Sequence, residues 1–310
     1  MNTYGYITAF LLLVIWAIYE IPVPKKTFSE LYDADPALEA DLLRFRSLPK
    51  KSFKKSGVKW TYLSVGSGAR HLLFMHGMGG AYDIWWQQIE ALQPDYHIIS
   101  LTLPEVHTLS EATAGILEIL DREGVEKVCF VGTSMGGYMA QYFLRQHPDR
   151  LDALVLGNTF PPNDLFRKEN GAIRKALPFI PEWLIMKIFR KNLAKTITPT
   201  SGNDPFTEAW LREQYFGLMT KKQFVGRLDL VLEYFDPGLP AAAENIPKLI
   251  IESDNDPLIR PDLRRQLKAL YPDASVFTFH EKGHFPYLND PQTYTRVLSG
   301  FLQEKVWLSK

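Results

Sequence analysis

Ser134 has the surroundings that point most directly to chemistry. It is the serine of a G-x-S-x-G motif that follows the apolar run Val128 to Val131 and precedes the helical pattern Tyr138 to Gln146. A strand, a tight turn and a helix in this order form a nucleophile elbow, which holds the serine hydroxyl clear of the sheet at the positive end of the helix. Gly132 and Gly136 fit this turn because a side chain at either place would collide with the neighbouring helix or strand. The segment therefore predicts that Ser134 is a nucleophile.

The base and the acid that such a serine needs are found downstream of it. A serine hydroxyl is a poor nucleophile near neutral pH, so a histidine must take its proton and a further group must orient that histidine. The segment Lys248 to Ser253 (KLIIES) predicts a buried parallel strand and is followed by Asp254 and Asp256, and the short strand predicted over Ser275 to His280 is followed by His284. Catalytic groups gather beyond the carboxyl ends of strands in open α/β sheets. His284 is the candidate base, and the two aspartates compete for the role of the acid.

A glycine-rich turn upstream of the serine suits an oxyanion hole. The strand predicted over Arg70 to Met75 is followed by the sequence HGMGG, which covers residues 76–80. Backbone N–H groups in such a turn point at the negative oxygen that develops on a substrate carbonyl. The N–H groups of Met78 and Met135 are the natural pair of donors.

Four segments together resemble one known family. HGMGG, GTSMGG, SDNDP and GHFPYLNDP match the four signature positions of the α/β-hydrolases in order and spacing, and the resemblance runs from about Ser56 to the end of the chain. It implies that Ser134 is the nucleophile, that His284 is the general base and acid, and that Asp256 orients the histidine. Asp256 is preferred to Asp254 because the acid of this family follows a G-[DE]-x pattern, here beginning with serine in place of glycine. The triad chemistry needs no cofactor, and the sequence has no clustered spacing of metal ligands.

One loop departs from the common pattern of that family. Many members carry a D-x-P-G-x-G loop after the strand that is predicted here over His97 to Leu101, whereas this chain has only the short connection Thr102 to His107. The short connection and the segment Leu156 to Phe160 resemble the maspardin-like branch. The truncated loop weakens any transfer of substrate specificity from better-known esterases.

The predicted architecture is one mostly parallel sheet with helices on both faces and a helical cap. Strands and helices alternate from about residue 58 to 160 and again from 248, which favours a single α/β core formed by residues 25–160 and 247–310. Residues 161–246 read as a helical cap or lid over the serine. Its apolar side chains are candidates for an acyl pocket, although most of them could equally pack the cap onto the core. The candidates are Phe160, Leu165, Phe166, Trp183, Met186, Phe189, Phe216 and Phe224, together with Phe285 beside the histidine.

The N-terminal 24 residues form a separate hydrophobic segment. Tyr4 to Tyr19 is nearly all apolar, and residues 1–19 carry no charged side chain. A spanning helix needs roughly 17 to 25 such residues, so we expect a membrane anchor and membrane association through residues 4–19. Lys25 and Lys26 follow the run, so the positive-inside rule predicts a cytoplasmic hydrolase domain. A cleaved signal peptide and a helix that packs on protein are the alternatives, although no small-x-small cleavage site follows the run.

Composition excludes some classes of function. The chain of 310 residues has 35 Lys and Arg against 35 Asp and Glu, so no overall positive charge suggests a nucleic-acid partner. The single cysteine, Cys129, lies in the apolar run before the elbow and reads as a buried core thiol. One cysteine forms no intramolecular disulfide, so nothing requires an oxidising compartment.

Two hypotheses from different classes follow. The first is a serine hydrolase that cleaves a carboxylic ester of a fairly apolar acyl group, with a small-molecule acyl ester or a lipid-like molecule as substrate. A serine rather than an aspartate at the elbow argues against the epoxide-hydrolase and dehalogenase branches of the same fold. The second hypothesis is a non-catalytic binding or scaffold protein on a hydrolase fold, since fold never fixes function. The maspardin-like resemblance favours the second hypothesis, and the intact Ser134, Asp256 and His284 favour the first.

Overall fold

The core of the molecule is a mostly parallel sheet of eight strands. The structure is a computed structural model that describes residues 3–307 of the chain. Within them the strand order is β1-β2-β4-β3-β5-β6-β7-β8; β1–β2 and β2–β4 pair antiparallel and the other neighbours pair parallel. The strands are β1 (Lys50–Lys55), β2 (Val58–Val65), β3 (His71–Met75), β4 (His97–Thr102), β5 (Val128–Thr133), β6 (Leu151–Gly157), β7 (Lys248–Ser253) and β8 (Ser275–Phe279). Every residue of β5 and β7 is buried, as expected for parallel strands that are covered on both faces.

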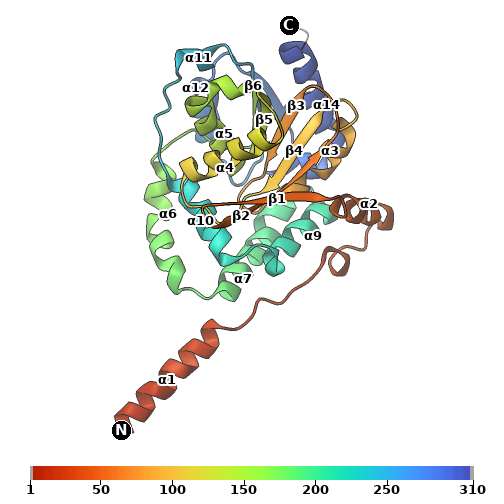
Figure 1. The fold of residues 1–310 in the computed structure, drawn as a ribbon. Coiled ribbons are helices and arrows are strands. Elements are labelled where there is room, and N and C mark those ends of the chain that lie inside the picture. Colours follow the sequence, from red (N-terminus) through yellow and green to blue (C-terminus); the bar gives the residue numbers. More distant parts are fainter. Residues whose placement is uncertain (1–2, 308–310) are drawn as a thin grey trace.

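Helices cover both faces of this sheet (Figure 1). One face packs against α4 (Leu109–Arg122), α5 (Met135–Gln146) and α12 (Pro261–Leu270). The opposite face packs against α3 (Trp86–Leu92) and α14 (Pro291–Phe301), with α2 (Pro36–Arg46) at its edge. The predicted mostly parallel sheet with helices on both faces is therefore confirmed.

A helical insertion lies between β6 and β7, and we use that term for residues 161–246. Its helices are α6 (Leu165–Ala176), α7 (Glu182–Asn192), α8 (Thr198–Thr200), α9 (Pro205–Glu213), α10 (Lys221–Leu232) and α11 (Ala241–Glu244). The short helix α13 (Pro286–Asn289) follows β8, and single turns complete the fold at Phe28–Glu30, Tyr82–Trp85, Pro148–Arg150, Leu177–Phe179, Leu193–Ile197, Gln214–Leu218 and Leu302–Trp307.

Local capping explains where α9 and α10 begin. Asp204 accepts the Thr207 N–H in front of α9, and Thr220 forms a reciprocal capping box with Gln223 in front of α10.

The prediction of an N-terminal membrane anchor is wrong for the part of the chain that the structure describes. Helix α1 (Thr3–Tyr19) has 17 residues, and between residues 3 and 307 no helix has the length and apolar character needed to cross a bilayer. At 1.5 Å per residue α1 extends roughly 25 Å, which is less than the roughly 30 Å of a hydrocarbon core. It ends at Tyr19 because Glu20, Pro22 and Pro24 follow. The predicted localisation, a single anchor with a cytoplasmic hydrolase domain, depended on that anchor and is withdrawn with it.

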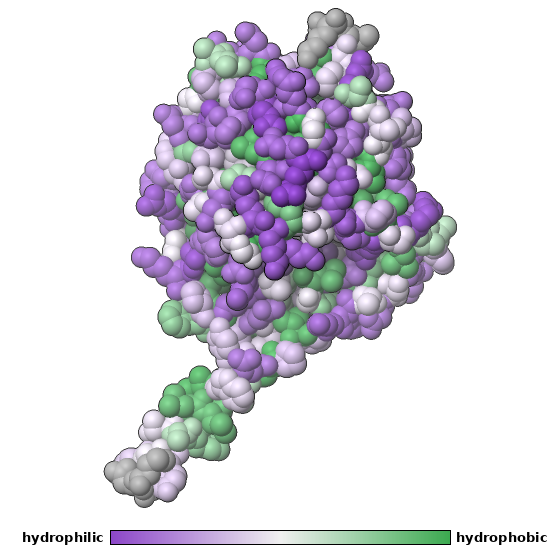
Figure 2. All heavy atoms as spheres, in the orientation of Figure 1, coloured by the Kyte–Doolittle hydropathy of each residue, from purple (hydrophilic) through white to green (hydrophobic). Residues whose placement is uncertain are grey.

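Helix α1 nevertheless has a defined attachment to the rest of the molecule. Its apolar side chains are largely exposed, and it projects from the body as a green rod in Figure 2. At its C-terminal end, Trp183 Nε1 donates to the Ile18 carbonyl at 2.9 Å and Tyr19 Oη donates to the Pro178 carbonyl at 2.8 Å. Lys221 Nζ in turn donates to Tyr19 Oη at 2.6 Å. The end of α1 is therefore attached to the helical insertion, through α7 and the start of α10.

The thiol of Cys129 is expected to be inert in the native protein. Cys129 lies in β5 with no exposed surface, and burial raises the pKa of its thiol. A disulfide reagent such as Ellman's reagent should therefore not react with the native chain, whereas the same chain in concentrated urea should release one equivalent of the chromophore. Rapid reaction of the native protein, at a rate unaffected by stabilising conditions, would contradict the burial of β5.

Candidate active site

Ser134 occupies a strained turn between β5 and α5. Its backbone has φ 53° and ψ −120°, in the region that L-residues rarely adopt. Three hydrogen bonds hold the turn: the Ser134 N–H donates to the Gly157 carbonyl at 2.9 Å, and the Ser134 carbonyl accepts from Thr159 Oγ1 at 2.6 Å and from the Tyr138 N–H at 3.0 Å. This is the geometry that the G-x-S-x-G motif predicts.

The two glycines of the motif are needed for space. A Cβ on Gly132 would lie 2.3 Å from the Gly136 carbonyl oxygen, and a Cβ on Gly136 would lie 2.4 Å from the Met75 carbonyl oxygen. Both contacts are with backbone atoms, which cannot turn aside as a side chain can. The sequence therefore has glycine where β5, β3 and the start of α5 meet.

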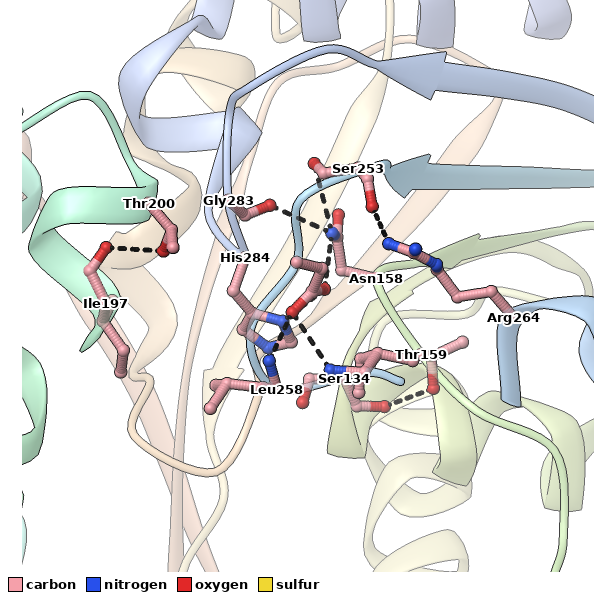
Figure 3. Close-up of polar contacts among 12 residues, drawn as sticks. Ser134, Asn158, Thr159, Ile197, Thr200, Ser253, Leu258, Arg264, Gly283 and His284 are labelled. Atoms are coloured by element: carbon pink, nitrogen blue, oxygen red, sulfur yellow. Dashed lines mark hydrogen bonds and ion pairs between the residues drawn. The ribbon is translucent and has the colours of Figure 1, made fainter. Parts of the chain in front are cut away.

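His284 and Asp256 form a buried pair beside the serine. His284 Nδ1 lies 2.8 Å from Asp256 Oδ2, and the two side chains are 3% and 0% exposed. Ser134 and His284 line the same cavity, and Figure 3 shows them in one cluster with Asn158. With Nδ1 donating to the carboxylate, Nε2 is the nitrogen left to exchange a proton with a substrate or with the serine.

The environment of Asp256 favours its ionised form. Burial opposes ionisation, but the nearby charge and hydrogen bond of His284 and the hydrogen bond from Asn158 outweigh it, so the pKa of Asp256 lies below its ordinary value. The backbone N–H groups of Leu258 and Ile259 add hydrogen bonds of 2.8 and 3.1 Å to Oδ1. A carboxylate in this setting stays negative at neutral pH and holds the histidine in one orientation.

Asp254, the competing acid, lies elsewhere. Its side chain is 44% exposed and accepts from His280 Nδ1 at 2.7 Å and from the Glu281 N–H at 3.0 Å. It therefore belongs to a surface pair at the end of β8. The geometry places Asp256, and not Asp254, against His284.

Asn158 is a site residue that the sequence reasoning missed. It follows β6 with φ 39°, and its Nδ2 donates to Asp256 Oδ2 at 2.9 Å and to the Gly283 carbonyl at 3.3 Å. One amide thus connects the aspartate with the residue that precedes His284. Its position directly beyond the carboxyl end of a parallel strand is the signal that could have found it.

The glycine-rich turn after β3 lies against the serine. A Cβ on Gly77 would be 3.1 Å from Ser134 Cβ, and Met78 lines the cavity with Gly77, Gly79 and Gly80. The N–H groups of Met78 and Met135, the predicted oxyanion donors, thus belong to the two segments that meet at the Ser134 side chain. This turn, residues 76–80, is called the oxyanion loop below.

A buried histidine holds one end of the oxyanion loop. Burial and the charge of Arg227 keep the pKa of His76 well below its ordinary value, so its ring is neutral. His76 Nδ1–H donates to the Gly77 carbonyl at 2.6 Å, and Nε2 accepts from the Leu103 N–H at 2.9 Å. Both ring nitrogens are engaged, so His76 supports the loop and has no nitrogen free for proton transfer.

The cavity at Ser134 is small and apolar. Its volume is about 200 Å³, and no lysine, arginine, aspartate or glutamate is found among the described residues that line it. The walls are formed mainly by Ile84, Phe189, Ile197, Tyr215, Met219, Phe224, Leu258, Phe285 and Tyr287, with Asn192 as a polar group. Burial raises the pKa of Tyr215 to about 12, so its hydroxyl is protonated at neutral pH.

The predicted pocket residues divide between this cavity and the core. Phe285, Phe189 and Phe224 line the cavity. Phe160 stacks on Tyr138 and contacts Phe166 in the core beneath α5, and Met186 is fully buried in the opposite core. Trp183 contacts the end of α1 as described above, while Phe216 lies under the Arg190 guanidinium and Leu165 is at the start of α6.

The short loop before α4 is engaged with the helical insertion. His107 Nδ1 lies 2.7 Å from Asp229 Oδ2, and Arg174 pairs with the same carboxylate. Glu105 lies 3.7 Å from His107 Nε2. Both Glu105 and His107 line a larger crevice of about 600 Å³ beside residues 19–23, separate from the cavity at Ser134.

Comparison with known proteins agrees with this fold. Residues 72–297 match the model of the alpha/beta hydrolase family. Maspardin from Danio rerio is 26% identical over 222 residues, which cover 70% of this chain and 69% of maspardin. A putative carbamate hydrolase, RutD, from Enterobacter cloacae is 23% identical over 244 residues, 74% of this chain and 90% of that protein. Among solved structures, a thermophilic esterase from Thermogutta terrifontis superposes with a TM-score of 0.69 at 20% identity over 84% of this chain and 100% of the esterase, a likeness of fold alone.

Proposed function

Because the chain belongs to the alpha/beta hydrolase family, we propose that it is a serine hydrolase that cleaves carboxylic esters of small, fairly apolar acyl groups through an acyl-enzyme on Ser134. The observation that carries this proposal is the coincidence, at one small cavity, of a serine in a strained elbow and a buried histidine–aspartate pair. The apolar walls and the lack of charged side chains among the described lining residues support a neutral acyl group.

The proposed reaction has two halves. In the first, His284 Nε2 takes the proton of Ser134 Oγ as that oxygen attacks the ester carbonyl carbon, and the carbonyl oxygen becomes negative. The N–H groups of Met78 and Met135 stabilise this oxyanion, and the alkoxide leaves with the proton from His284. In the second half, His284 takes a proton from water, the hydroxide attacks the acyl carbon, and Ser134 is released with the proton returned to its oxygen.

The helical insertion is proposed to act as a cap. Phe189, Asn192, Tyr215, Met219 and Phe224 all belong to it and line the cavity. They would exclude water from the acyl group and set its length. The substrate is proposed to be a small-molecule ester or a lipid-like ester whose acyl part enters this space.

A fluorophosphonate probe tests the proposal directly. Such probes react with serines that a neighbouring base activates, so the folded wild-type chain is expected to be labelled once, and peptide mapping is expected to place the adduct on Ser134. Protein unfolded in urea should remain unlabelled because the His284–Asp256 pair no longer lies beside the serine. A panel of acetyl to octanoyl esters, assayed in parallel, would give the acyl preference.

The outcome that contradicts the proposal is also clear. If the folded protein neither takes the label nor hydrolyses any ester of the panel, the serine is not activated. The non-catalytic binding hypothesis would then describe the same cavity better. Labelling at a serine other than Ser134 would refute the assignment of the nucleophile.

A further inference from the structure

Arg227 is a buried cation in contact with the oxyanion loop. It lies on α10 of the helical insertion and is 1% exposed. Its Nη1 donates to the Met78 carbonyl at 2.6 Å and to the Gly80 carbonyl at 3.0 Å, and its Nη2 donates to the Leu103 carbonyl at 3.3 Å. One guanidinium therefore joins the oxyanion loop to the connection that follows β4.

The burial of this group is unusual because no opposite charge accompanies it. Of the carboxylates between residues 3 and 307, none lies within ion-pair distance of Arg227, and its partners are backbone carbonyls and Met219 Sδ at 3.5 Å. Burial lowers the pKa of Arg227 to about 10, so it remains charged at neutral pH. A buried charge without a counterion is costly, and its hydrogen bonds compensate only in part. Proteins commonly retain such a destabilising group at a functional site.

Close packing brings α10 to this position. A Cβ on Gly226 would lie 2.4 Å from the Val106 carbonyl oxygen, so the helix and the 102–107 connection touch backbone to backbone. Glycine at residue 226 therefore places the next residue, Arg227, within reach of both loops. Met219, which lines the cavity, lies just before α10.

We propose that Arg227 is a positioning residue for the oxyanion hole, which fixes the oxyanion loop so that the Met78 N–H faces the carbonyl bound at Ser134. This inference rests on the proposed function, because it assigns a role in the same reaction. The oxyanion loop contains three glycines, whose backbones have many accessible conformations when they are free. Arg227 holds the carbonyls of Met78 and Gly80, on either side of Gly79, while His76 holds the carbonyl of Gly77.

The charge of the guanidinium adds to the effect of its geometry. A fixed positive group behind hydrogen-bond donors stabilises negative charge that develops in front of them, most strongly in a dry site. The benefit exists mainly in the transition state, because the substrate carbonyl is neutral before attack. Arg227 should therefore affect kcat and have little effect on substrate binding.

The origin of Arg227 in the helical insertion has a further consequence. If α10 moved away from the core, the guanidinium would leave the oxyanion loop with it. The oxyanion hole would then be complete only when the insertion is seated, so that a substrate is attacked only in the closed cavity.

Kinetics of Arg227→Met and Arg227→Lys in the full chain test this inference. For Arg227→Met, kcat on the best ester of the panel is expected to fall about 10- to 100-fold while KM stays within about 3-fold. The affinity for an alkyl boronic acid, which forms an oxyanion-like adduct on the serine, should fall by the same factor as kcat/KM. Arg227→Lys keeps the charge without the fork of donors, so it should lie between the wild type and Arg227→Met.

Arg145→Met is the matched control. Arg145 also donates to backbone carbonyls, those of Asp236, Pro237 and Gln141, but has no contact with the oxyanion loop. The Arg145→Met variant should have a lower melting temperature than the wild type, with unchanged kcat and boronate affinity. The inference is overturned if Arg227→Met raises KM with kcat unchanged, or if the Arg145 and Arg227 variants lose kcat equally. If Arg227→Met does not fold, unchanged kcat and boronate affinity in folded Arg227→Lys overturn it.

The two proposals fail in different ways. A wild-type chain that takes no fluorophosphonate and hydrolyses no ester contradicts the hydrolase proposal itself. A wild-type chain that is labelled and active, with Arg227 variants that match it in kcat and boronate affinity, contradicts only the role of Arg227.

Discussion

Replacing Ser134 with alanine is expected to lower kcat for ester hydrolysis by about 10⁴-fold or more, with the fold left intact. The chemical reason is that, among the described residues that line the cavity, Ser134 is the only serine, threonine or cysteine. The structural reason is that the Ser134 side chain makes no capping hydrogen bond at the start of α5, although it occupies the N-cap position. The free energy of unfolding should therefore change by less than about 1 kcal/mol. Initial rates and a urea titration on the same preparation measure both quantities.

A double replacement sharpens this prediction. His284→Ala alone should cost about as much as Ser134→Ala, because the serine is not activated without the base. The double variant should be no slower than either single variant, since residues that act as a unit give non-additive losses. Losses that multiply would mean that the serine and the histidine act independently, and the acyl-enzyme mechanism would then be wrong.

The parts of the site that the sequence predicted are those that local pattern determines. β5 and β7 are fully buried strands, and β8 pairs parallel with β7, so the residues that follow these three strands must lie at the carboxyl edge of the sheet. Ser134, Asp256 and His284 come together for that reason, and the resemblance to the family and its maspardin-like members is confirmed. The strand pattern alone does not separate Asp254 from Asp256, because both follow β7; the preference for Asp256 came from the resemblance to the family, and in the structure it is Asp256 that contacts His284.

The cavity walls could not be predicted in the same way. Hydrophobic periodicity predicts which side of a helix is buried, but it does not predict whether that side faces the core or a cavity. Phe160 and Met186, which were predicted to line the pocket, lie in the core. Tyr215 and Met219, which were not predicted, line the cavity from the irregular turn before α10. Arg227 carries no signal in the sequence at all, because its partners are carbonyls that any residue could supply.

The N-terminal helix shows a different limit of sequence reasoning. The apolar character of residues 4–19 suggested a membrane span, and the helix itself is present as α1. Glu20 and the prolines after it set the C-terminal end of the helix, and its 17 described residues are too few for a span. The composition of a sequence segment identifies an apolar helix, whereas the length of the helix determines whether it can cross a bilayer.

Asp256→Asn and Asp254→Asn are expected to differ by about three orders of magnitude in their effect on kcat. Asp256 accepts from His284 Nδ1 inside the protein, so an amide in its place removes the negative charge and can impose the wrong tautomer on the ring; a loss of about 10³- to 10⁴-fold is expected. Asp254 pairs with His280 at the surface, so its amide variant should retain kcat within about 2-fold. The pair is a matched test, because both changes remove one carboxylate from the same loop.

The pH dependence of stability gives a second measurement on Asp256 that is independent of activity. The pKa of Asp256 is lowered in the folded chain, so its ionised form contributes stability above its ordinary pKa of about 3.9, and this contribution is lost as the pH falls below that value. Asp256→Asn should therefore unfold with a weaker dependence on pH below about 4 than the wild type, measured by urea titration between pH 3 and 7. Equal kcat losses in the two variants would remove Asp256 from the site. A large loss in Asp254→Asn alone would instead make the surface carboxylate the partner of His284, which the 2.8 Å contact between His284 and Asp256 argues against.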